Sequence, residues 1–156
     1  MAQLPYKNYN QTKIQTSDQL SLIILLYDGL SRFLRKGQRK IVEKDYEGAH
    51  HYLTRSRDIV NELLVTLRVE EGNKVAQNLR SLYVFMIGRI IEANLKKDAA
   101  IVDEVLKVAQ NLRDGWTQLK DQQAQLRQQK HQTSANDEIV RPVSYTHLTL
   151  PTTPYV

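Results

Sequence analysis

The sequence contains no cysteine, and only four of its 156 residues are prolines, all of them outside positions 6–141. The absence of cysteine excludes a disulfide scaffold and a thiolate metal site. The long interior without proline is rich in Leu, Gln, Lys and Arg, which predicts mainly helical structure. A hydrophobic content of 41% is enough for one modest core, so length and composition together predict a single domain.

Long apolar runs are also absent. No window approaches the ~18 consecutive apolar residues of a membrane span, and the first residues do not resemble a signal peptide. We therefore expect no membrane insertion and a cytoplasmic location. The net charge of +5 is mild, and the basic residues of the first predicted helix are not interleaved with stacking aromatics. We interpret them as a solvated helix face that can steer a partner, and we expect no nucleic-acid binding.

Signatures of catalysis are missing as well. The sequence shows no Ser/His/Asp arrangement and no glycine-rich phosphate loop. Glu47 and His50 form a Glu-x-x-His motif, but a di-iron bundle needs two such motifs and two further inward glutamates. We therefore expect a protein that is not an enzyme and that uses no metal or cofactor.

Hydrophobic spacing predicts four helices joined by short connections, which is typical of an antiparallel bundle. Thr16 and Gln19 fit a capping box at the start of the first helix, and Asp45 and Asp98 fit N-caps of the second and fourth. Gly72 interrupts the pattern before the third helix. The predicted stripes of the first, second and fourth helices comprise Leu20, Ile23, Tyr27, Leu30, Leu34 and Ile41; Tyr46, Ala49, Leu53, Ser56, Val60, Leu63 and Leu67; and Ile101, Val105, Val108, Leu112 and Leu119.

The third helix carries a charge on its apolar stripe. The predicted seam consists of Val75, Leu79, Leu82, Met86, Arg89 and Ala93, at alternating steps of four and three. An unpaired buried charge costs several kcal/mol, so Arg89 needs a partner or an edge position. Asp28 and Glu92 are the candidate partners.

The two ends of the chain differ from its middle. We interpret residues 1–15 as a loosely held N-terminal arm, residues 16–120 as the bundle, and residues 121–142 as a fraying helix or tail anchored by Leu126 alone. Residues 143–156 change abruptly to Thr, Pro and β-formers without charge. We interpret them as an extension foreign to the domain. The expected fold is an all-α antiparallel four-helix bundle with this arm and a disordered C-terminal tail.

Three blocks of sequence closely resemble the flagellin-specific export chaperones of the FliS family. The first is Leu26-Tyr27-Asp28-Gly29 with Phe33 and Leu34, and the last runs from Asp103 to Trp116. The middle block matches the family's third helix at Asn78, Leu79, Leu82, Tyr83, Met86, Arg89, Ala93, Asn94 and Asp98. The blocks occur in the family's order and spacing, and the resemblance covers residues 6–120.

This resemblance implies a chaperone that holds the C-terminal segment of flagellin, its client, prevents premature polymerisation and hands it to the export gate. The residues expected to contact the client are Tyr6, Tyr9, Ile14, Leu26, Tyr27, Tyr83, Met86, Arg89 and Asn94. Tyr27 and Tyr83 fit core packing equally well, and the isolated glycines within the helices fit either close packing or room for a client backbone. The alternative is a helical-bundle interaction or regulatory protein that self-associates or binds another helical partner. A chaperone free of its client can also form a homo-oligomer.

Overall fold

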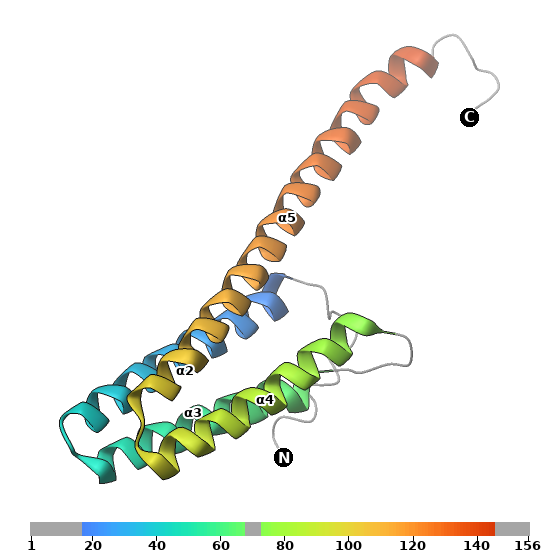
Figure 1. Ribbon diagram of the computed structural model, residues 1–156. Coiled ribbons are helices and arrows are strands. Elements are labelled where there is room, and N and C mark those ends of the chain that lie inside the picture. Colours follow the sequence, from blue (N-terminus) through green and yellow to red (C-terminus); the bar gives the residue numbers. More distant parts are fainter. Residues whose placement is uncertain (1–16, 68–72, 146–156) are drawn as a thin grey trace, which may run out of the picture. The chain divides into compact units, whose positions relative to one another are not determined.

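The computed structural model describes residues 17–67 and 73–145, and within them it contains four helices and no strand. The helices are α2 (Ser17–Val42), α3 (Tyr46–Thr66), α4 (Lys74–Lys96) and α5 (Ala99–Tyr145). Successive helices run in opposite directions in Figure 1, so α2, α3, α4 and the first part of α5 form an antiparallel bundle. This architecture confirms the predicted fold class. Residues 1–15 and 146–156, which include the predicted arm, lie outside the described residues.

Side-chain caps fix where the helices begin. Asp45 accepts a hydrogen bond from the Gly48 backbone N–H at 3.0 Å, and the Asp98 carboxylate accepts one from the Ala100 N–H at 2.9 Å. Both caps are those predicted, because a cap depends on local sequence. Asn73 caps α4 in the same way, with an oxygen to nitrogen distance of 3.1 Å. Thr16, the predicted first cap, lies outside the described residues.

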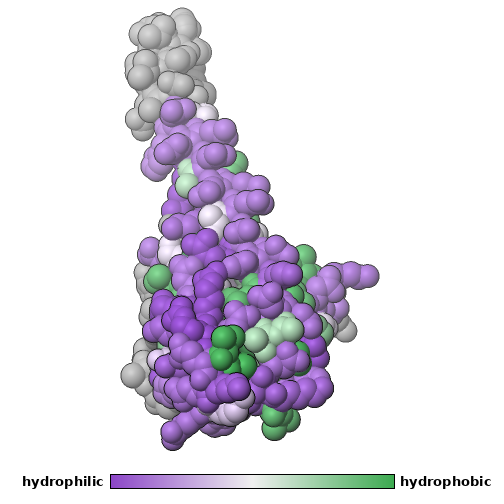
Figure 2. Space-filling view, turned by 60° about the vertical axis from the view of Figure 1, so that its left-hand side comes forward, coloured by the Kyte–Doolittle hydropathy of each residue, from purple (hydrophilic) through white to green (hydrophobic). Residues whose placement is uncertain are grey.

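The core follows the predicted stripes closely on α2 and α3. Five of the predicted α2 residues are buried, and on α3 only Tyr46, which is 49% exposed, clearly departs from the prediction. Most of the buried residues form one hydrophobic core cluster, to which all four helices contribute. The surface in Figure 2 is mostly hydrophilic and interrupted by small hydrophobic areas, as expected when amphipathic helices turn their apolar stripes inward.

The predicted seam of α4 is wrong by one residue over part of its length. The buried residues are Ala76, Tyr83, Met86, Ile90 and Ala93, whereas Val75 is 70% exposed. The side chain of Arg89 lies at the margin of the core and is 25% exposed. The observed seam keeps the same steps of three and four, and it places an isoleucine at the position where the prediction had a charge.

The long helix α5 belongs to two compact units, with the boundary between Thr117 and Gln118. In the second unit the helix continues to Tyr145, well beyond the predicted end of the bundle at residue 120. The helix therefore includes all of residues 121–142, the segment interpreted from the sequence as a fraying helix or tail. Leu126 is 63% exposed, so it does not anchor this part of the helix as predicted.

Gly37 lies where α2 packs closely against α3. A methyl group built on its Cα would lie 2.9 Å from Cδ2 and 3.0 Å from Cγ of the fully buried Leu53. Apart from the helix's own nearby backbone, no atom of the described residues lies within 4 Å of a methyl group built at Gly88 or Gly115. Close packing therefore explains Gly37, but the same explanation is wrong for Gly88 and Gly115.

We expect Gly37→Ala to destabilise the protein, because the added methyl group clashes with Leu53. The free-energy cost of this clash is expected to exceed the gain in helix propensity. Overpacking costs about 1–3 kcal/mol, against about 1 kcal/mol gained when alanine replaces glycine in a helix. The matched control is Gly115→Ala, which gains the propensity without a steric clash. Urea unfolding should place Gly37→Ala below wild type and Gly115→Ala above it. Equal gains in both variants would show that Leu53 moves aside freely.

Candidate functional site

Three of the predicted client-contact residues lie inside the bundle. Tyr27 and Met86 have no exposed surface and Tyr83 has 2%, so all three side chains pack in the core of this structure. The hydroxyl groups of Tyr27 and Tyr83 are 2.6 Å apart and hydrogen bond to each other. Burial raises the pKa of both phenols, although the nearby Trp116 side chain acts to lower it. This hydrogen-bonded pair joins α2 to α4 within the core.

Arg89 has the partners that its position requires. Its guanidinium donates hydrogen bonds to Glu92 at 2.6 Å and to Glu104 of α5 at 2.8 Å. Glu92 also accepts a hydrogen bond from Lys96 at 2.8 Å. Both cations lower the pKa of Glu92, and Lys96 has the larger effect. The expected pairing with Glu92 is confirmed. Asp28, the other candidate partner, pairs with Arg113 of α5 instead.

The remaining two predicted residues within the described part of the chain occupy different places. Leu26 is half-buried and packs against the core cluster from α2. Asn94 is half-buried on α4, and its side-chain nitrogen lies 2.9 Å from Nδ1 of His50 on α3. Of the predicted residues that the structure describes, only Asn94 lines the pocket between these two helices.

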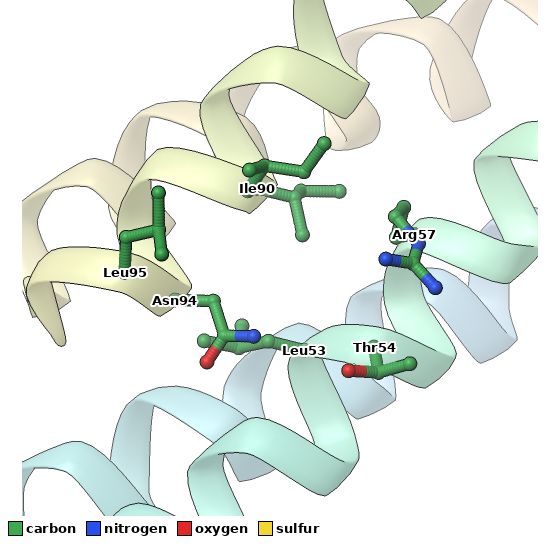
Figure 3. Close-up of a pocket in the computed structure, with 7 residues that line it drawn as sticks. Leu53, Thr54, Arg57, Ile90, Asn94 and Leu95 are labelled. Carbon is green, nitrogen blue, oxygen red and sulfur yellow. The ribbon is translucent and has the colours of Figure 1, made fainter.

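A pocket of about 190 Å³ lies between α3 and α4. Its lining residues are Leu53, Thr54, Arg57, Ile90, Ile91, Asn94 and Leu95. Figure 3 shows Thr54 and Arg57 on α3 across from Ile90 and Asn94 on α4. The α4 side of the pocket is mainly apolar and the α3 side carries polar groups, so the pocket suits an amphipathic segment.

The apolar side of the pocket is part of a longer exposed surface on α4. Val84, Gly88, Ile91 and Leu95 follow one another at steps of four, three and four, which places them on one face of the helix. The exposed fractions of the three larger residues are 51% for Val84, 42% for Ile91 and 81% for Leu95. We call these four residues the α4 apolar face. Its apolar side chains are repeated over several turns, which is typical of an interaction surface.

Two polar atoms beside this face have no partner among the described residues. They are Nε of Arg57 and Oγ1 of Thr54, and both are buried. A buried polar group without a hydrogen bond costs about 1–3 kcal/mol, so a bound segment that supplied a partner would recover part of that free energy. Arg57 supplies a donor, and the Thr54 hydroxyl can donate or accept.

Two kinds of site are not found in residues 17–67 and 73–145. No group of three or more His, Cys, Asp or Glu side chains in these ranges is placed to hold a metal ion. No helix there combines the length and the apolar character needed to cross a membrane.

Comparison with known proteins identifies the family. Residues 1–123 match the family model described as flagellar protein FliS. The chain belongs to the FliS family. It is 31% identical to the flagellar secretion chaperone FliS of Campylobacter jejuni over 116 residues, which cover 74% of this chain and 91% of that protein. It is 29% identical to the chaperones of the same name from Bacillus subtilis, over 74% of this chain and 86% of that one, and from Escherichia coli, over 68% and 79%.

Membership of the FliS family makes this protein a flagellar export chaperone and not an enzyme. Sequence reasoning missed the α4 apolar face, although it lies in the segment that carries the strongest resemblance. The signal was present, because Val84, Ile91 and Leu95 form a second apolar series beside the core series. A second series at helical spacing indicates that the helix has two apolar faces, of which the core buries only one.

Proposed function

We propose that this chaperone binds the C-terminal segment of flagellin in the cytoplasm, keeps it from polymerising early, and delivers it to the flagellar type III export apparatus. The observation that carries the proposal is the α4 apolar face beside the pocket between α3 and α4. A surface of this kind binds an amphipathic helix through apolar anchors spaced along it. The family relationship is what directs the choice of client.

The apolar α4 side and the polar α3 side of the pocket suggest how a client would lie. Its apolar side chains would cover Ile91 and Leu95, and Gly88 would let its backbone come close, since the space above Gly88 is open. A polar group of the client would meet Arg57 Nε at the opposite side of the pocket. Such a segment folds as it binds, and the ordering entropy lowers the affinity and so favours later release.

Other expected contacts remain part of the proposal. Arg89 is accessible at the edge of α4, and Leu26 is partly accessible on α2. The arm of residues 1–15, with Tyr6, Tyr9 and Ile14, is proposed as a cover that the client displaces. A self-associating bundle is the second candidate, because an exposed apolar face also fits another copy of the chain.

Calorimetric titration with flagellin tests the proposal directly. We expect full-length flagellin to bind with one client per chaperone, and flagellin without its C-terminal segment to lose binding by at least tenfold, since that segment is proposed to supply the apolar anchors. Undiminished binding of the truncated client would refute the proposed mode. Light scattering on the free chaperone separates the second candidate, because a self-associating bundle changes mass with concentration.

A further inference from the structure

A group of cations surrounds two stacked rings where α2 packs against α3. The rings of Phe33 and Tyr52 stack with centroids 6.1 Å apart and planes inclined by 25°. Arg32 and Arg55 place their guanidinium carbons 5.5 Å and 5.2 Å from the Phe33 centroid. Lys36 places its ammonium nitrogen 5.5 Å from the Tyr52 centroid. We call these five residues the cation-aromatic patch.

The charge of this patch is not neutralised by its surroundings. None of the ion pairs among the described residues includes Arg32, Lys36 or Arg55. Arg32 and Lys36 are also four residues apart on α2, where like charges destabilise a helix. Cation-π contacts with the two rings offset part of this repulsion, and an anionic partner would offset more of it.

The patch is separate from the proposed client site. Thr54 and Arg57 of α3 line the pocket on the side of α4. Tyr52 and Arg55 of the same helix instead meet Phe33 on the side of α2. Because the two groups lie on different sides of α3, occupation of one leaves the other accessible.

We propose that the cation-aromatic patch is a docking surface for an acidic segment of a second protein partner. Guanidinium groups bind carboxylates through paired hydrogen bonds, and the arginines here are exposed while the rings beneath them limit their motion. Single-stranded nucleic acid is less suitable, because it needs free ring faces on which bases stack. The rings here already stack on each other and lie beneath the cations.

The test uses the full chain and a fluorescein-labelled deca-glutamate peptide at low ionic strength, where exposed charges are least screened. We expect fluorescence anisotropy to show binding that Arg32→Ala with Arg55→Ala weakens by roughly tenfold, since two charge-assisted contacts are lost. The matched control is Arg80→Ala with Lys107→Ala, which removes the same charge from exposed positions on α4 and α5. It should change the affinity by less than about twofold.

A third variant separates the rings from the charges. Phe33→Leu keeps every cation and removes the ring over which both arginines lie, so it should weaken peptide binding by about threefold. Absence of peptide binding to wild type, or equal losses in the arginine and control variants, overturns the proposal. Tighter binding of a deca-thymidine strand, with the same dependence on Arg32 and Arg55, also overturns it in favour of a nucleic-acid site.

Discussion

Ile91→Glu combined with Leu95→Glu is expected to weaken flagellin binding by at least about 100-fold, because a carboxylate buried without a partner costs several kcal/mol. Both side chains are exposed in the free protein, at 42% and 81%. The unfolding free energy should therefore change by no more than about 0.5 kcal/mol. Calorimetric titration measures the affinity, and urea unfolding of the same samples measures the stability.

The matched control introduces the same charge on another side of α4. Val75→Glu with Phe85→Glu uses residues that are 70% and 48% exposed and that do not line the pocket. Phe85 lies one turn before Arg89, whose guanidinium contacts α5. The control should keep nearly wild-type affinity. Equal losses in the two double variants would show that net charge, and not the α4 apolar face, determines client binding.

Local features of the fold could be predicted from the sequence. The caps at Asp45 and Asp98 depend on a hydrogen bond to a backbone N–H two or three residues away, so the residue type and its position are sufficient. The stripe on α2 was also predictable, because Leu20, Ile23, Tyr27, Leu30 and Leu34 keep alternating steps of three and four.

The register of α4 could not be decided in the same way. Both the series through Val75 and Arg89 and the series through Ala76 and Ile90 keep the spacing of a packed helix. Spacing cannot choose between them, whereas packing against α3 and α5 can. The structure buries Ile90 and leaves Arg89 at the edge, where Glu104 of α5 reaches it.

The candidate sites depend on residues that are distant in sequence. The cation-aromatic patch was missed because Tyr52 lies on the helix after the one that carries Arg32 and Lys36. A search for aromatic residues among the basic residues of one helix therefore does not find both rings of the patch. The bond between Tyr27 and Tyr83 spans 56 positions, and neither residue type predicts it alone.

Tyr27→Phe and Tyr83→Phe are each expected to destabilise the protein by about 1–3 kcal/mol, because either change leaves the other buried hydroxyl without its partner. Both rings stay buried, and the hydroxyl oxygens of the wild type are 2.6 Å apart. The double variant removes both polar groups, so it should be nearly as stable as wild type. Urea unfolding of the four proteins gives the coupling energy.

The same variants change how stability depends on pH. Burial raises the pKa of both phenols in the folded state, whereas an unfolded tyrosine titrates near a pKa of about 10. Below that pH both states are protonated and the contribution to stability is complete. As the pH rises further, the unfolded chain loses its protons first, so the free energy of unfolding falls. Wild type should therefore lose stability above about pH 10 more steeply than the double phenylalanine variant. Two results together would show that the hydroxyl pair does not stabilise the core. The first is that the losses of the two single variants add in the double variant, and the second is that wild type and the double variant lose stability equally above about pH 10.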